Sequence, residues 1–163
     1  MDLATDIQRI AEQEQRLQLS RMNLDVAWQL GVRLREIAAS RSTPLTIEIR
    51  LAGETVFFSS MPGTAPANTD WARRKRNTVE LMHRSSYGVG RSLERDGRTL
   101  QDTMGLAHRD YSSHGGSFPL RVRDVGVVGV VTVSGAPQRE DHHIVVMALA
   151  ELCEVRLAEI ELD

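Results

Sequence analysis

The run VGVVGVVTV at residues 125–133 constrains the fold most, because it is the most apolar and β-branched stretch of the chain. Such a run is typical of a strand buried on both faces, and it predicts the centre of a sheet. Arg123-Asp124 fits a two-residue hairpin back to a partner strand at residues 118–122. Residues 134–137 (SGAP) end the strand, since proline cannot donate to a ladder.

Helical and strand patterns fill most of the remaining chain. Apolar residues recur every three or four positions where helices are expected, and Asn23 is a suitable N-cap for the second of them. The expected order is helices at about 2–19 and 23–39, a hairpin at 45–60, a helix at 71–82, an interruption at 83–90 and a closing helix at about 139–160. This order predicts an α+β fold, with an antiparallel sheet covered by helices.

Two local features predict close packing. Gly31 lies inside the second helix, where glycine costs about 1 kcal/mol relative to alanine, so we expect a neighbouring element to approach there. The closing helix is apolar around much of its first half, at residues 144–150. We therefore expect it to be covered on two sides, by the sheet and by another helix or another subunit.

Length and charge bound the class of protein. A chain of 163 residues suffices for one domain, expected to span residues 1–163. With 20 basic and 22 acidic side chains the formal net charge is −2, so no overall field attracts nucleic acid or an anionic membrane. The single cysteine, Cys153, excludes an internal disulfide and suits a reducing compartment. Without a leader pattern or a long apolar run, we expect a cytoplasmic protein with no membrane insertion.

Standard catalytic motifs are missing from the chain. Ser134-Gly135 lacks the glycine that a nucleophile elbow requires two residues before the serine, and no Gly-rich phosphate loop occurs. No two histidines have the i, i+4 spacing that directs two rings toward one metal from a helix face. The five histidines are His83, His108, His114, His142 and His143.

Two histidines are candidates for binding a ligand. His114 precedes Gly115-Gly116, where the backbone can come close to a ligand; alternatively it is a loop histidine bonded to a carbonyl. His142 lies near the start of the closing helix and either bonds a turn or contacts a ligand or subunit. Its neighbour Asp141 is of a residue type that more often caps a helix than acts in catalysis.

The basic run at residues 73–76 (RRKR) has two interpretations. On a helix it spreads over most of the circumference, which is typical of a solvated face. Alternatively, Arg74 or Lys75 belongs to an anion site for a carboxylate or phosphate. Aromatic residues are too few, and not interleaved with basic ones, to predict a stacking platform for nucleic acid.

Several of these runs together resemble a known family. The signature of the haem-degrading-domain proteins, which include HbpS-like and GlcG-like proteins, is similar to residues 115–119 (GGSFP), 125–130, 133–135 and Asp141-His142. The UPF0303 subgroup has a further segment, which resembles Trp71, Arg74, Lys75, Ser85 and Ser86 here. The resemblance implies a profilin-like fold and a homo-oligomer, either a dimer or a larger ring. It implies haem as a hypothetical cofactor, and no axial ligand is carried over because the shared motif is glycine, proline and valine.

Two functions follow as hypotheses. In the first, the protein binds haem or another small ligand, with haem degradation or redox sensing as its further role. His114 or His83 would lie near the iron, and Arg74 or Lys75 near the propionates. In the second, it is a non-catalytic oligomeric interaction or chaperone-cofactor module. A concave pocket that joins His114, Asp141, His142 and Lys75 favours the first. Neither hypothesis names a reaction.

Overall fold

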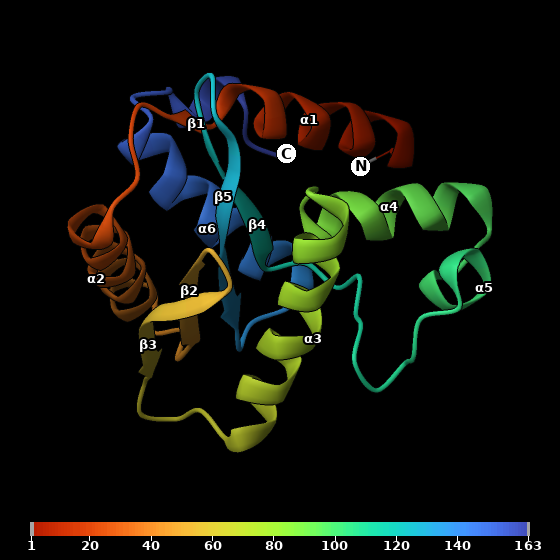
Figure 1. Ribbon diagram of the computed structural model, residues 1–163, viewed down its shortest axis with the longest axis horizontal. Coiled ribbons are helices and arrows are strands. Elements are labelled where there is room, and N and C mark those ends of the chain that lie inside the picture. The colour runs from red at the N-terminus through yellow and green to blue at the C-terminus, as the bar shows by residue number, and fades with distance from the viewer. Residues whose placement is uncertain (1, 163) are drawn as a thin grey trace.

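The computed structural model describes residues 2–162 (Figure 1). Its helices are α1 (Leu3–Arg16), α2 (Leu24–Ser40), α3 (Pro66–Met82), α4 (Ser86–Asp96), α5 (Leu100–Met104) and α6 (Gln138–Leu152), with a 3-10 turn at Leu157–Glu159. Its strands are β1 (Gln18–Leu19), β2 (Thr46–Leu51), β3 (Glu54–Ser60), β4 (Ser117–Val122) and β5 (Gly126–Ser134). The α+β architecture with a helix-covered sheet is therefore confirmed, and no described helix is long and apolar enough to cross a membrane.

The five strands form one sheet in the order β1-β4-β5-β2-β3, so β5 is central as predicted. All neighbours are antiparallel except the short β1, which pairs with β4 in parallel. The predicted two-residue hairpin is wrong, because Val122 pairs with Gly126 across a three-residue connection in which Asp124 has φ 62°. The extra residue leaves Val125 70% exposed, so this end of the run is not buried on both faces.

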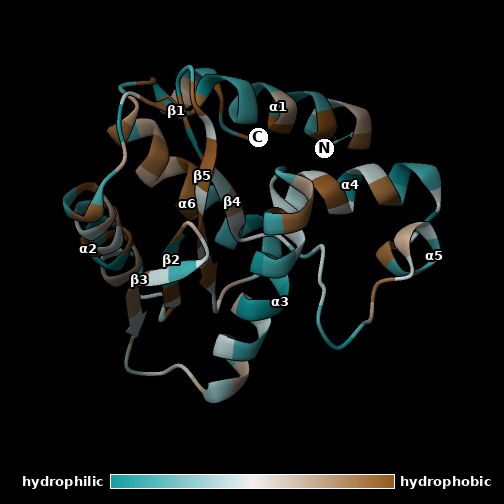
Figure 2. Ribbon diagram, viewed as in Figure 1, coloured by the Kyte–Doolittle hydropathy of each residue, from teal (hydrophilic) through white to brown (hydrophobic). Residues whose placement is uncertain are grey.

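The two faces of the sheet differ in polarity. One face carries Ile47, Val131 and Phe118 into the main hydrophobic core, where α2 and α6 cover it. The other face carries Thr132 and Glu48, and α3 lies over it (Figure 1). Figure 2 shows the same division, with β5 and α6 mostly hydrophobic and α3 mostly hydrophilic. Polar residues that enter this second layer must find partners there, because buried polar groups without hydrogen bonds are costly.

Helix packing confirms both predictions of close contact. The apolar α6 is covered by the sheet on one side and by α2 on another, so this chain supplies the second cover itself. At Gly31 an added Cβ would lie 2.5 Å from the Phe57 ring of β3, which explains the glycine within α2. The N-cap is also confirmed, since the Asn23 side chain accepts a hydrogen bond from the backbone of Val26.

Some element boundaries differ from those predicted. α3 begins at Pro66, which sits in the first turn where proline loses no helical hydrogen bond. The helix is interrupted after Met82 as predicted, but only over residues 83–85. Gly88 and Gly90 lie inside α4, and an added Cβ at Gly90 would meet the Ser113 carbonyl at 2.4 Å. α6 ends at Leu152, eight residues before the predicted end at residue 160. The contact at Gly90 is one that helical periodicity does not encode.

Candidate functional site

A buried ion pair lies at the centre of the site. The Lys75 ammonium of α3 donates to Asp141 Oδ2 of α6 at 2.9 Å, and both side chains are 3% exposed. The same Nζ donates to the carbonyls of Gly115 and Val133 at 2.9 and 2.8 Å. A lysine has three donors, so all of them are used. The pair therefore joins α3, the glycine loop, the end of β5 and the start of α6.

The electrostatics of the pair reflect its burial. Burial lowers the pKa of Lys75 and raises the pKa of Asp141, while the attraction between the two charges opposes both shifts. Asp141 Oδ1 also accepts from the backbone N–H of Ala136 at 3.0 Å, so this carboxylate caps the turn before α6. Lys75 has no donor left for a ligand and acts as a positioning residue.

The glycine pair allows close approach of protein backbone. A Cβ at Gly115 would lie 2.2 Å from the Gln138 carbonyl of α6. Gly116 has φ 123°, a conformation that side chains with a Cβ rarely adopt, and its carbonyl accepts from the backbone N–H of Val133. The two glycines thus hold the loop against β5 and α6 and fix where His114 leaves it.

His114 stacks on Trp71 at the surface of this layer. The ring centroids are 5.0 Å apart with an interplanar angle of 15°, and the Arg74 guanidinium lies 4.3 Å from the Trp71 ring centroid. Partial burial, and then the charges of Lys75 and Arg74, lower the pKa of His114 below 6.5. The imidazole is therefore neutral at pH 7 and keeps a nitrogen lone pair, the form in which histidine binds a metal.

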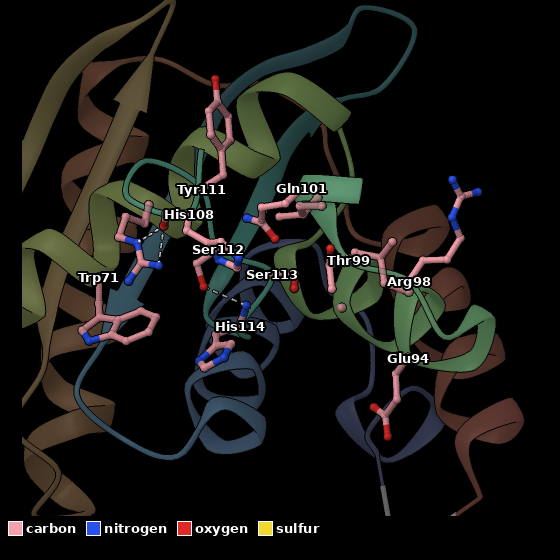
Figure 3. A pocket seen from close by; sticks show the side chains of 14 residues that line it. Trp71, Glu94, Arg98, Thr99, Gln101, His108, Tyr111, Ser112, Ser113 and His114 are labelled. Carbon is pink, nitrogen blue, oxygen red and sulfur yellow. Dashed lines mark hydrogen bonds between the residues drawn. The ribbon is translucent and has the colours of Figure 1, made fainter. Parts of the chain in front are cut away.

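Two cavities meet at the stacked rings. The first, here called the His108 cavity, has a volume of about 300 Å³ and lies between Trp71, His108, His114 and residues of α4 and α5 (Figure 3). The second, called the Ser134 cavity, has a volume of about 220 Å³ and reaches the Lys75–Asp141 pair. Figure 3 shows Trp71 and His114 side by side at one end of the His108 cavity. Trp71 and His114 line both cavities.

The loop before the glycines is held to α3 by hydrogen bonds. Arg74 donates to the His108 carbonyl at 2.6 Å through Nη2, and the Ser112 backbone N–H donates to the Arg74 carbonyl at 3.1 Å. Ser112 Oγ in turn accepts from the His114 backbone N–H. Sequence reasoning missed His108, Tyr111 and Ser112 as lining residues, because their segment has no periodicity that would place it.

The structure gathers some of the predicted site residues and separates others. His114, Gly115, Lys75 and Asp141 line the Ser134 cavity, and Arg74 with His114 lines the His108 cavity. Gly116 is buried next to them, since an added Cβ there would lie 2.7 Å from Lys75 Nζ. His83 lies elsewhere: it is the left-handed C-cap of α3 and borders another cavity with Glu80 and Gly129. No group of three or more metal-ligating side chains occurs among residues 2–162.

His142 is placed in the core rather than in either cavity. Its Nε2 lies 2.8 Å from Gln13 Oε1, and the Gln13 amide nitrogen donates to the Ile160 carbonyl. Because the amide oxygen can only accept, His142 Nε2 must carry the proton in this bond. Burial lowers the pKa of His142 to about 3, so the ring is neutral. His142 thus links α6 to α1.

His142 should make folding sensitive to acid. Its folded pKa of about 3 lies below the ordinary value of 6.5, so the unfolded chain binds more protons between these values. The stability from neutral His142 is present above pH 6.5 and is lost as the pH falls. We expect His142→Gln to reduce the dependence of unfolding free energy on pH by up to about 1.4 kcal/mol per pH unit between about pH 4 and 6, measured by urea unfolding. His108→Gln, on an exposed loop, is the control, and an unchanged slope in His142→Gln would contradict the assignment.

Comparison with known proteins identifies the class. The family described as "Haem degrading protein HbpS-like" matches residues 22–150. Among solved structures, that of the Ybr137w protein has a TM-score of 0.83 and 25% identity, covering 91% of this chain and 87% of its own. A PduOC:Heme complex has a TM-score of 0.69 and 22% identity, covering 79% and 93%, which shows likeness of fold. The chain therefore belongs to the HbpS-like family.

Within that family, the chain is similar over its whole length to proteins named UPF0303. The UPF0303 protein of Azotobacter vinelandii is 53% identical over 163 residues, covering 100% of this chain and 98% of the relative. That of Sinorhizobium medicae is 48% identical over 163 residues, covering 100% and 99%. The resemblance to the UPF0303 subgroup that the sequence motifs indicated is confirmed. In the structure the paired serines of that motif are structural, since Ser85 caps α4 and Ser86 bonds the backbone of Ser117.

Proposed function

We propose that the protein binds a small ligand beside the stacked rings of Trp71 and His114, with haem as the first candidate. The observation that carries the proposal is an exposed imidazole, stacked on Trp71, at the border of two cavities. The haem-degrading description of the family and the heme complex formed by a protein of the same fold support the choice of ligand. The single cysteine suits the reducing cytoplasm in which we expect the protein to act.

The donor set around Trp71 fits haem. Histidine is a common axial ligand of haem iron, and His114 offers a nitrogen lone pair at the cavity border. Arg74 and Arg98 both line the His108 cavity, and guanidinium groups bind carboxylates such as propionates well. The volume of about 300 Å³ is at the lower end for ligand cavities, so this cavity would take part of the ligand rather than enclose it.

Each residue would then have a distinct role. His114 would bind the iron, Arg74 would hold a carboxylate, and Trp71 would provide an aromatic surface. Lys75 and Asp141 would not contact the ligand but would fix the loop that carries His114. Bound haem would supply a redox-active iron, the chemistry that haem degradation or redox sensing requires.

A haem titration followed at the Soret band tests the proposal. We expect saturable binding, and we expect His114→Ala to weaken it by about tenfold or more, because the histidine that borders both cavities is lost. His83→Ala is the matched control, since His83 lies at a different cavity and its removal should leave the affinity unchanged. If binding occurs, loss of the Soret band after addition of a reductant and oxygen would indicate degradation.

The opposite results lead to the second hypothesis. Absence of saturable binding to the folded protein would exclude haem, and equal affinity of His114→Ala and the unmodified protein would exclude His114 as ligand.

The alternative, a homo-oligomeric interaction module, is favoured by one observation: Leu24 and Trp28 are largely exposed and lie one turn apart on α2. A second copy of this chain is the partner in that proposal, and sedimentation of Trp28→Ala would show whether assembly depends on this face.

A further inference from the structure

A third cavity lies on the side of α3 that faces away from Trp71. It has a volume of about 620 Å³, within the range of small-molecule sites, and we call it the Phe58 cavity. Its walls are β2, β3, the connection after β3 and one face of α3, on which Thr69, Ala72, Arg73 and Arg76 recur at helical spacing. Because none of its lining residues is shared with the His108 or Ser134 cavity, it is a separate site.

An incompletely bonded ion pair forms part of the lining. Arg76 Nη1 donates to Glu48 Oε1 at 2.8 Å, and the two side chains are only 15% and 11% exposed. Arg76 Nε is buried without a hydrogen-bond partner among the described residues, and Nη2 reaches Asn77 only at 3.4 Å. Glu48 accepts one further bond, from Thr55. A guanidinium has five donors and a carboxylate about four acceptor positions, so both groups have unused capacity.

The rest of the lining combines an apolar wall with balanced charge. Phe58 is 48% exposed, and the short apolar residues Ala65, Pro66 and Ala72 line the cavity with it. The other two charged residues of the lining, Asp70 and Arg73, also form an ion pair, at 3.4 Å. Two acidic and two basic side chains give a formal charge of zero. A simple anion would meet two carboxylates there, and a simple cation would meet two guanidinium groups.

From this lining we infer that the Phe58 cavity binds a zwitterion with an apolar side chain, the chemistry of a free hydrophobic amino acid. The ligand carboxylate would take the unused Nη donors of Arg76, since Nε is buried out of its reach, and the ammonium group would take the unused acceptor positions of Glu48. The apolar side chain would pack against Phe58. The Arg76–Glu48 hydrogen bond remains in place, because the ligand uses only the donors and acceptor positions that this bond leaves free.

Calorimetric titration with three related compounds tests the ligand class. L-Phenylalanine carries both charges, 3-phenylpropionate lacks the ammonium group and 2-phenylethylamine lacks the carboxylate. We expect saturable binding of phenylalanine and affinities about tenfold lower or worse for the other two, since each loses one charge-assisted contact. Equal affinities for the three compounds, or no saturable binding of phenylalanine to the folded protein, would overturn the inference.

Variants locate the site. Phe58→Ala removes a half-exposed ring and should weaken phenylalanine binding about fivefold or more, whereas Val125→Ala, at a more exposed apolar position on a distant turn, should not. Arg76→Gln should weaken it about tenfold, and Arg50→Gln is its control, because Arg50 forms an ion pair with Glu80 outside the cavity. Circular dichroism checks that each variant is folded. Unchanged binding in Phe58→Ala and Arg76→Gln would contradict the assignment to this cavity.

Discussion

Lys75→Met is expected to destabilise the protein by about 3–5 kcal/mol, because it leaves the Asp141 carboxylate buried without its counter-ion. The substitution also removes the donor from two buried carbonyls, those of Gly115 and Val133. Methionine has nearly the volume of lysine, so lost packing contributes little. Urea unfolding followed by circular dichroism measures the change in the free energy of unfolding.

Two comparisons separate the buried pair from other effects. Arg73→Met removes a neighbouring but half-exposed charge of the same helix and should cost less than about 1 kcal/mol. The double variant Lys75→Met with Asp141→Leu removes both charges, and should be less destabilised than the sum of the two single variants. A loss below about 1 kcal/mol for Lys75→Met would show that the pair does not hold these elements together.

Gly116→Ala should also be strongly destabilising, by about 2–6 kcal/mol, from backbone strain and overpacking together. Its φ is 123°, and an added Cβ would lie 2.6 Å from the Val133 carbonyl and 2.7 Å from Lys75 Nζ. Neither neighbour can move freely, because the first belongs to the central strand and the second to the buried pair. The melting temperature and the free energy of unfolding in urea both report the effect.

Gly97→Ala is the matched control for this substitution. Gly97 also has a positive φ, of 62°, but nothing lies within 4 Å of an added Cβ there. The loss of unfolding free energy should then come only from placing alanine in the left-handed backbone conformation, roughly 1–2 kcal/mol. If the two alanine variants were destabilised equally, the close contacts around Gly116 would have no energetic role.

The environments of the basic residues 73–76 could not be predicted from the sequence. The sequence predicts either a solvated face or an anion site at Arg74 or Lys75, but in the structure the side chains of this run have different environments. Lys75 is buried against Asp141, Arg74 bonds the His108 carbonyl, and Arg76 pairs with Glu48. Helical periodicity gives the angle of each residue around α3, but it does not say which side will meet a polar sheet.

The candidate site was predictable in part. Of the four residues whose meeting in one pocket favours ligand binding, three, His114, Lys75 and Asp141, do border one cavity, because the glycine loop and the start of α6 meet at the end of β5. His142 does not join them, since it turns toward Gln13 of α1. The role of His114 as a ligand remains a prediction that the haem titration will decide.

The sequence alone determined the central strand, the β2–β3 hairpin, the cap at Asn23 and the close approach at Gly31. The first three depend on residues near one another in the chain, whereas at Gly31 the sequence indicates that an element approaches but not that Phe57 is the partner. Only the tertiary structure decided that Lys75 pairs with Asp141, and that the two sides of α3 face different cavities. Such pairings join residues far apart in sequence, so they are fixed by how α3 and α6 pack on the sheet and not by any local pattern.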